Sequence, residues 1–203
     1  MTDVCILDYG AGNVRSVFNL FAAVADQVNV SNDSSHIRDA SHIVLPGVGA
    51  FKAAMRKIRE KIPVDVVEDE VVSGKPFLGI CVGMQVMADA GTEFGEHEGL
   101  GWISGRVERL DPGDLPLPHV GWNDISVRRH HPILEGLEST PDFYYVHSYA
   151  FRPASKEDEL ATTEFGETFT AVVQKDRFIG VQFHPEKSQK AGLRLVRNFL
   201  SIS

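Results

Sequence analysis

Residues 77–90, Phe-Leu-Gly-Ile-Cys-Val-Gly-Met-Gln-Val-Met-Ala-Asp-Ala, join a strand-like segment, 77–81, to a helix-like segment, 82–90. At the junction Cys81 has a glycine two residues before it and another two residues after it. This spacing is typical of a tight strand-to-helix turn that lifts a nucleophile to the edge of a sheet, where larger side chains would collide with backbone. The helix N-terminus stabilises a thiolate, and the amide of Val82 would face an oxyanion. The stretch therefore predicts a cysteine nucleophile on an α/β sheet.

A second stretch supplies a candidate base and acid. Residues 180–186, Gly-Val-Gln-Phe-His-Pro-Glu, end a predicted strand and present His184 with Glu186 two residues later. A carboxylate that orients one imidazole nitrogen leaves the other free to exchange a proton with a thiol. Read alone, a histidine before proline is more often a surface or capping residue. The order nucleophile, histidine and acid along the chain favours a catalytic triad.

The first half of the chain alternates strand and helix patterns, which is the rhythm of a parallel sheet covered by helices. Asn13 is expected to cap the first helix. The predicted strands are 4–7, 27–30, 42–45 and 77–81, and the helices are 14–24, 51–62, a further turn or two within 64–72, and 82–90.

The second half changes to short strands separated by turn residues, which indicates antiparallel hairpins, and closes with an amphipathic helix over 188–200. We expect one domain, 1–203, with an α/β fold whose mostly parallel central sheet has an antiparallel extension. The predicted strands are 105–110, 123–127, 143–146, 160–163, 170–174 and 178–181.

Composition limits the function. The net charge is −8, which disfavours nucleic acid and anionic membranes as partners. The two cysteines, Cys5 and Cys81, have no zinc-type spacing, so we expect no metal site and no cofactor. Cys5 fits a buried strand. The N-terminus has no signal-peptide pattern and the apolar runs are short, so a cytoplasmic protein is expected.

Five blocks of sequence together resemble one known family. They are residues 45–51, 75–85, 118–123, 145–149 and 180–188, with Pro-Gly-Val-Gly, Gly-Trp-Asn and His-Pro-Glu-Lys-Ser among their motifs. The chain is similar to the class I (triad) glutamine amidotransferases and, among them, to the glutaminase subunit of imidazole glycerol phosphate synthase. The resemblance covers essentially the whole chain, and it implies a flavodoxin-like three-layer sandwich.

The resemblance also implies roles for individual residues. Cys81 attacks the γ-amide of L-glutamine, His184 carries the proton and Glu186 orients His184. The amides of Val48 and Val82 would form the oxyanion hole, with glycines on either side of Val48 leaving that peptide free to turn. The glutamine pocket would be lined by Gly49, Gln85, His147, Ser148 and Tyr149.

A partner follows from the same resemblance. The family's glutaminase forms a heterodimer with a cyclase subunit, a (β/α)8 barrel that uses the ammonia to make imidazole glycerol phosphate and AICAR in histidine biosynthesis. The expected interface residues are His119, Trp122, Asn123 and Lys187. A tryptophan in such a segment is, on sequence alone, more often a core residue.

Three alternatives remain open at this point. The chain could be the glutaminase of another synthase, of the pyridoxal phosphate or anthranilate type, although the Gly-Trp-Asn block argues against that. It could be a free-standing γ-glutamyl hydrolase, which should be secreted or vesicular. It could also be a non-catalytic binding module, which an intact triad disfavours.

Overall fold

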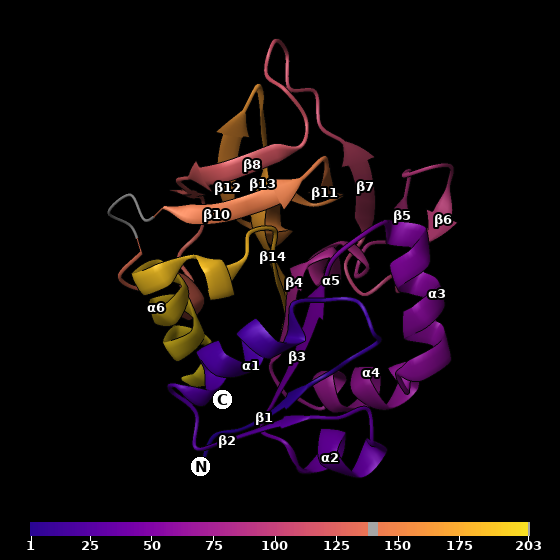
Figure 1. The fold of residues 1–203 in the computed structure, drawn as a ribbon, viewed down its shortest axis with the longest axis vertical. Coiled ribbons are helices and arrows are strands. Elements are labelled where there is room, and N and C mark those ends of the chain that lie inside the picture. The colour runs from indigo at the N-terminus through magenta and orange to yellow at the C-terminus, as the bar shows by residue number, and fades with distance from the viewer. Residues whose placement is uncertain (138–141, 203) are drawn as a thin grey trace.

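The strand that ends in Cys81 lies inside a large mixed sheet. The computed structural model describes residues 1–137 and 142–202. Within them the central sheet has eight strands in the order β2-β1-β3-β4-β14-β13-β12-β9 (Figure 1). The parallel half contains β2 (Gln27–Val30), β1 (Asp3–Ile6), β3 (His42–Gly47), β4 (Phe77–Cys81) and β14 (Phe178–Val181). The antiparallel extension contains β13 (Glu167–Lys175), β12 (Glu159–Phe165) and β9 (Ser126–Val127).

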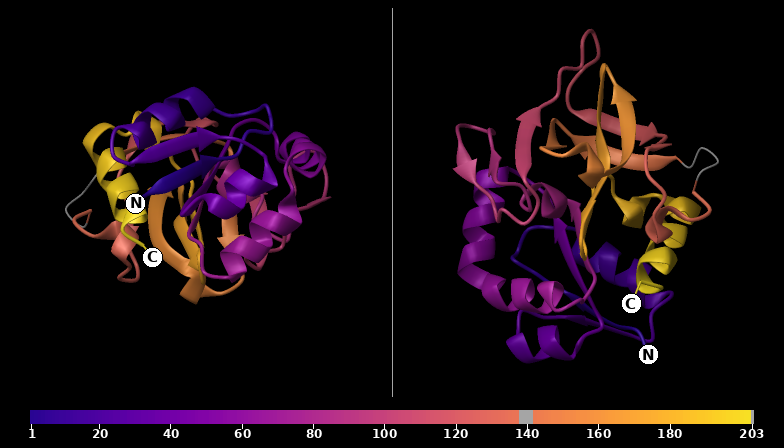
Figure 2. Two further views of the ribbon diagram at one scale, coloured as in Figure 1. Left: turned by 90° about the horizontal axis from the view of Figure 1, so that it is seen from below. Right: turned by 180° about the vertical axis from the view of Figure 1, so that it is seen from behind.

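Helices cover both faces of the parallel half, as the alternating pattern predicts. On one face α1 (Val14–Ala22) packs with α6 (Gln189–Leu200), and on the other α2 (Ser34–Asp39) packs with α4 (Val64–Val72). Figure 2 shows this separation from below, with α3 (Phe51–Lys61) on the side of α4. The predicted α/β class, with its antiparallel extension, is therefore confirmed.

Two smaller sheets lie over the carboxyl edge of the parallel strands. One is an antiparallel ribbon of β8 (His119–Asn123) and β10 (Phe143–His147). The other has the order β11-β7-β5-β6, with β11 (Tyr149–Pro153), β7 (Gly105–Arg109), β5 (Ala90–Gly91) and β6 (His97–Glu98). The described part of the chain also contains three short 3₁₀ turns: η1 (Pro132–Leu134), η2 (Lys156–Asp158) and η3 (Pro185–Lys187).

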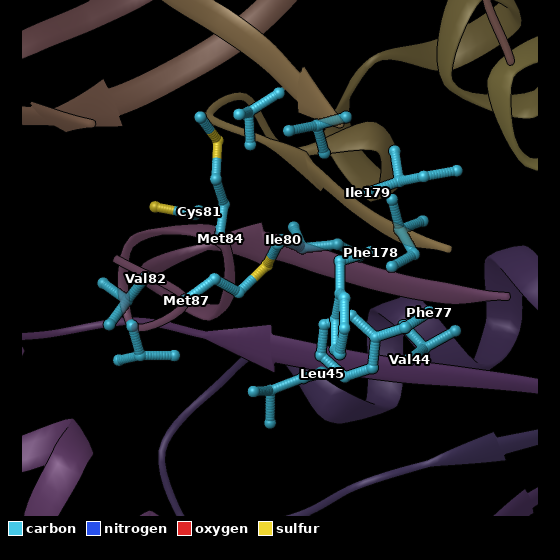
Figure 3. Close-up of a cluster of buried hydrophobic side chains, with 14 of the residues drawn as sticks. Val44, Leu45, Phe77, Ile80, Cys81, Val82, Met84, Met87, Phe178 and Ile179 are labelled. Carbon is cyan, nitrogen blue, oxygen red and sulfur yellow. The ribbon is translucent and has the colours of Figure 1, made fainter. Parts of the chain in front are cut away.

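A buried apolar cluster fixes β4 against its neighbours. The rings of Phe77 and Trp102 meet edge to face at 5.2 Å, and Trp102 stacks on Phe178 at 4.8 Å. Figure 3 shows Met87 extending towards Phe77 and Phe178 and Met84 extending away from them, with Cys81 at the border of the cluster. Truncating a buried aromatic such as Phe77 would cost roughly 3–5 kcal/mol. The turn that carries Cys81 is therefore anchored to well-packed core.

The helix after Cys81 is shorter than predicted. The pattern predicts a helix over 82–90, but α5 (Val82–Gln85) ends at Gln85 and the chain has entered β5 by Ala90. The carbonyls of Val86 and Ala88 accept hydrogen bonds from the amides of Leu100 and Gly101 instead of from later helical residues. The loop that contains Leu100 and Gly101 thus pairs with the carbonyl groups that would otherwise have accepted hydrogen bonds within a longer helix.

Other boundaries also differ from the predictions. The predicted strand 123–127 is wrong: β8 pairs with β10 and ends at Asn123, and the chain then changes partner so that β9 pairs with β12. Helix α2 and strand β11 were not predicted, and α4 is a full helix. Helix α1 does begin after Asn13, but the Asn13 side chain makes no capping hydrogen bond.

Candidate active site

Cys81 occupies a turn with an unfavourable backbone conformation. Its φ is 55° and its ψ is −111°. A positive φ is uncommon outside glycine, costs roughly 1–3 kcal/mol and is concentrated at functional sites. A Cβ on Gly83 would overlap the carbonyl oxygen of Leu45, and one on Gly79 would lie 2.5 Å from the carbonyl oxygen of Gly83. Close packing therefore requires both glycines, as the sequence predicts.

Two side chains that follow β14 approach the Cys81 sulfur. The Nε2 atom of Gln182 lies 3.7 Å from Sγ, and His184 lines the same cavity as Cys81. The parallel pairing of β4 with β14 causes this meeting, because the carboxyl ends of parallel strands reach the same sheet edge. Segments a hundred residues apart thus deliver a thiol and a base to one place.

His184 is held by Glu186. The Nδ1 atom of His184 lies 2.9 Å from Oε1 of Glu186, and the two side chains are only 4% and 1% exposed. Because a carboxylate accepts hydrogen bonds, Nδ1 carries the proton and Nε2 is left for the sulfur. In the described part of the chain, the second carboxylate oxygen of Glu186 is buried without a hydrogen-bond partner. The predicted acid therefore lies where it can fix the imidazole.

The charge state of His184 suits proton transfer. Burial by itself lowers the pKa of His184, but the Cys81 sulfur and the Glu186 carboxylate outweigh it and raise the pKa to about 10. The site thus favours a protonated imidazole beside the sulfur near neutral pH. Such a group can stabilise a thiolate and can donate a proton to a leaving amine.

A cavity of about 220 Å³ opens over the sulfur. It is lined by Cys81 and His184 together with all seven residues predicted for glutamine and the oxyanion. These are Val48, Gly49, Val82, Gln85, His147, Ser148 and Tyr149. The structure therefore brings the predicted pocket residues together around the candidate nucleophile, although their individual roles stay predictions.

The Gly47–Gly49 segment forms one rim of this cavity. Gly49 has a φ of +92° and open space around it, so glycine is needed there for its backbone conformation. Gly47 is needed for a different reason: a Cβ on it would lie 2.5 Å from the amide nitrogen of Gly83 and 2.7 Å from the hydroxyl of Tyr9. Close packing therefore requires glycine at position 47 and backbone conformation requires it at position 49, while the turning of the Val48 peptide stays a prediction.

The sequence predictions missed two side chains at the site. Gln182 contacts the sulfur and is fully buried, and a polar residue within a buried strand end two positions before His184 was the available signal. Glu93 lines the cavity, and its carboxylate accepts a hydrogen bond of 2.8 Å from the amide of Phe51 at the start of α3. No local pattern marks Glu93.

The outer face of the β8–β10 ribbon is apolar and exposed. Val120 and Trp122 are 56% and 47% exposed, and the register places them opposite Val146 and Tyr144. Trp122 meets Tyr144 edge to face at 5.8 Å, and the ammonium of Lys187 lies 5.3 Å from the centre of the Tyr144 ring. Trp122 is therefore not a core residue, and Lys187 borders both this face and the cavity.

His119 does not lie on that outer face. Its side chain is 3% exposed and stacks on Phe165, with ring centres 4.0 Å apart. It alternates with Val120 and Trp122 along β8, so it points to the inner side of the ribbon. The prediction that His119 touches a partner directly does not fit this burial. Its Nε2 atom lies 3.4 Å from Nδ2 of Asn123, a neighbour that was also predicted for the interface and is half-buried.

Among the described residues, no group of three or more His, Cys, Asp or Glu side chains is arranged to hold a metal ion. No helix among residues 1–137 and 142–202 is long and apolar enough to cross a membrane.

The sheet, the cysteine turn and the His–Glu pair together form the arrangement expected of a cysteine-nucleophile enzyme on an α/β fold. The family model for glutamine amidotransferase class-I matches residues 5–202, and the chain belongs to this family. Solved structures agree at the level of the fold. A glutamine amidotransferase structure superposes with a TM-score of 0.75 at 22% identity, covering 98% of this chain and 97% of that chain. PurLQS from Thermotoga maritima gives 0.75 at 16% identity, with the same coverage.

Within this family, the chain is most informatively compared with relatives that it matches over nearly its full length. The chain is 46% identical to imidazole glycerol phosphate synthase subunit HisH of Salinibacter ruber, over 97% of this chain and 93% of that protein. It is 47% identical to the protein of the same name from Zymomonas mobilis, over 97% and 94%. The resemblance read from the five sequence blocks is therefore confirmed.

Proposed function

We propose that this chain is the glutaminase subunit of an imidazole glycerol phosphate synthase. It hydrolyses L-glutamine to glutamate and ammonia, and the ammonia passes to a cyclase partner that makes imidazole glycerol phosphate and AICAR in histidine biosynthesis. The full-length similarity to HisH proteins carries the proposal, and the thiol, imidazole and carboxylate at one cavity support it. The other synthase types and the free-standing hydrolase have no comparable support.

In the first half of the reaction the Cys81 thiolate attacks the γ-carbonyl carbon of glutamine. The electron pair of the carbonyl moves to its oxygen, where the amides of Val48 and Val82 would donate hydrogen bonds. The tetrahedral intermediate collapses to a thioester as the C–N bond breaks. His184 gives its proton to the leaving nitrogen, which departs as ammonia.

In the second half, water attacks the thioester while neutral His184 takes up a proton from it. Glutamate leaves, and the Cys81 thiolate and protonated His184 are restored. Glu186 does not exchange protons with the substrate: it keeps Nδ1 of His184 protonated and the ring oriented. Glu93 is the acidic lining residue of the cavity, and it is suited to the ammonium group of the amino acid.

The partner would dock on the outer face of the β8–β10 ribbon. Exposed aromatic and aliphatic side chains with a neighbouring cation are typical of the centre of a protein interface. We propose a heterodimer with a (β/α)8 barrel placed over Trp122, Asn123 and Lys187. Lys187 also lines the cavity, so ammonia would travel a short path. A cytoplasmic location accords with this biosynthetic role.

The test measures ammonia release from glutamine by the isolated chain, by the chain with a co-expressed barrel partner, and by that complex with the acceptor substrate. Trp122→Ala should weaken partner binding roughly 30-fold or more, since a buried aromatic anchor is worth about 2 kcal/mol or more. Val72→Ala is the matched control, because Val72 is 74% exposed at the end of α4, at the other end of the molecule (Figure 1). Absence of glutaminase activity from every preparation would rule out the proposal.

A further inference from the structure

Two buried histidines that take no part in the proposed chemistry lie between the ribbon and the cavity. His119 and His147 face each other across β8 and β10, and they are 3% and 7% exposed. The Nδ1 atom of His119 lies 3.1 Å from Nε2 of His147. Buried polar pairs of this kind need a defined proton arrangement, because an unmatched donor or acceptor has no water to replace its partner.

The surrounding groups determine which nitrogen carries each proton. The Nδ1 atom of His147 lies 2.9 Å from the carbonyl oxygen of Tyr149, which can only accept, so Nδ1 is the donor. Burial lowers the pKa of His147 to about 3 and that of His119 to about 4, so both rings are neutral. The Nε2 atom of His147 then accepts from Nδ1 of His119, and Nε2 of His119 is left as an acceptor for Asn123.

The chain of hydrogen bonds continues to the nucleophile. The carbonyl of Tyr149 also accepts a hydrogen bond of 2.9 Å from Nε2 of Gln85. Gln85 in turn donates to Oε1 of Gln182 at 3.1 Å, and Gln182 is the residue whose amide approaches the Cys81 sulfur. A continuous network therefore runs from Asn123, through both imidazoles, to a wall of the cavity and on to Cys81.

Packing holds the first ring of this network in place. His119 lies nearly parallel to Phe165 and to Tyr145, with ring centres 4.0 and 4.9 Å away and interplanar angles of 21° and 20°. Asn123 is fixed as well, because its Nδ2 atom donates to the carbonyl of Glu164 at 2.8 Å. A ring clamped in this way can transmit a fixed orientation to the group it bonds.

We propose that His119 and His147 are positioning residues that hold the Tyr149 wall of the glutamine pocket and, through it, the carboxamide of Gln85. The inference rests on the proposed function, since it names what orients the pocket for glutamine. The part of the pocket formed by Tyr149 would contact glutamine equally in the ground state and in the transition state. The network is therefore expected to change KM for glutamine more than kcat.

The test compares two substitutions at one position in the complex with its partner. His119→Phe keeps the stacked ring but removes the donor to His147. His119→Asn can place its Nδ2 near the former Nδ1 and retain that donor. We expect His119→Phe to raise KM for glutamine roughly tenfold, the effect of losing a hydrogen bond of about 1.4 kcal/mol, with kcat changed less than about twofold. His119→Asn should recover most of the wild-type KM.

Two controls separate this proposal from the proposed function. If the wild-type complex does not hydrolyse glutamine, the proposed function is wrong. An active wild type combined with an unchanged KM in His119→Phe, or with a fall in kcat alone, would overturn the positioning role. Alkylation of Cys81 by iodoacetamide, which needs no glutamine pocket, should proceed at the wild-type rate in both variants.

A second measurement does not depend on activity or on any variant folding. Nitrogen NMR of the ¹⁵N-histidine-labelled wild-type chain at neutral pH should show two neutral rings protonated at Nδ1. An imidazolium at either position, or a proton on Nε2 of His147, would contradict the hydrogen-bond direction on which the proposal depends.

Discussion

The main-chain carbonyl of Tyr144 accepts a hydrogen bond of 2.8 Å from the amide of His184. The amide of Tyr144 donates to the hydroxyl of Ser188 at 3.0 Å, and that hydroxyl donates back to the carbonyl of His184. The strand whose outer face carries Tyr144 beside Trp122 is thus bonded directly to the segment that carries the candidate base. A partner docked on the ribbon would therefore contact a strand whose backbone is hydrogen-bonded to the segment that positions His184.

Replacing the candidate nucleophile should separate the two reactions of the complex. We predict that Cys81→Ser and Cys81→Ala abolish glutamine hydrolysis and leave the fold intact, because an alcohol is a far poorer nucleophile than a thiolate at neutral pH. Synthesis supported by added ammonia should persist in the complex. The measurement is product formation with glutamine or with ammonia as nitrogen source. Glutamine-dependent turnover by Cys81→Ala would remove the triad assignment.

The two cysteines should differ strongly in reactivity. Cys81 lines the cavity beside His184, whereas Cys5 lies inside β1 and burial raises its pKa to about 11. A glutamine-like electrophile should therefore label Cys81 much faster than Cys5. Brief labelling followed by peptide mass mapping measures both sites in one sample. Equal labelling would count against a nucleophilic Cys81.

Removing the base should cost more than removing the acid that orients it. We predict a loss of roughly 10⁵–10⁶-fold in kcat for His184→Ala and a loss about ten- to a hundredfold smaller for Glu186→Gln. Glutamine at position 186 keeps the size of the side chain but can offer a donor to Nδ1, which favours the wrong tautomer. Steady-state kinetics of both variants in the complex provides the comparison. The reverse order would mean that the two roles are misassigned.

The Val48 peptide offers a two-state element for activation by the partner. If that peptide turns to donate its amide to the oxyanion, a donor worth roughly 3–4 kcal/mol becomes available, and activation could reach about a hundredfold or more. Gly49→Val should lower the partner-stimulated rate, because valine disfavours the φ of +92° at this position.

A matched control exists for the Gly49 experiment. Gly74 also has a positive φ, +115°, and open space, but it lies in the turn before β4 and away from the cavity. Gly74→Val should cost comparable stability without lowering the stimulated rate. An isolated chain that already turns over glutamine at the full rate of the complex would refute the switch, although the triad could still stand.

Acid should destabilise the fold through the two network histidines. Their pKa values in the folded protein, about 4 for His119 and about 3 for His147, lie below the unfolded value of 6.5. The unfolded chain therefore binds more protons below pH 6.5, and stability falls as the pH drops from there towards the folded values, by at most about 1.4 kcal/mol per pH unit for each ring. Denaturant unfolding between pH 7 and 4 measures the slope, which His119→Phe should reduce.

Neighbouring groups do not reverse this sign. The groups that face the pair are Tyr145, Asn123 and His184. Burial raises the pKa of Tyr145, which therefore stays neutral throughout this range. The pKa of His184 is raised as well, so the stabilising contribution of His184 is complete below pH 6.5 and is lost as the pH rises towards its folded value of about 10. A slope that is the same in wild type and in His119→Phe would contradict the assignment of neutral, buried rings.

Local sequence determined the cysteine turn and the sheet around it. Three features act within a few residues of one another: the glycines at 79 and 83, the buried strand before Cys81 and the apolar spacing of the helices. Steric limits and hydrophobic periodicity therefore predict them from the sequence. Helix α5 stops at Gln85, against the local pattern, because the carbonyls of residues 86–89 accept hydrogen bonds from the backbone of residues 99–103. The local pattern fails again at Asn123, where the chain leaves one strand partner for another.

What the sequence alone established about this protein is its candidate chemistry: a thiol at Cys81, a base at His184 and an acid at Glu186, with a fold that can bring them together. The tertiary structure alone decided that Gln182 and Glu93 join the site, that Trp122 is exposed, and that His119 turns inward to bond His147. The first set depends on short-range backbone geometry, which a few neighbouring residues impose. The second depends on strand pairing and burial between distant segments, which no local pattern encodes.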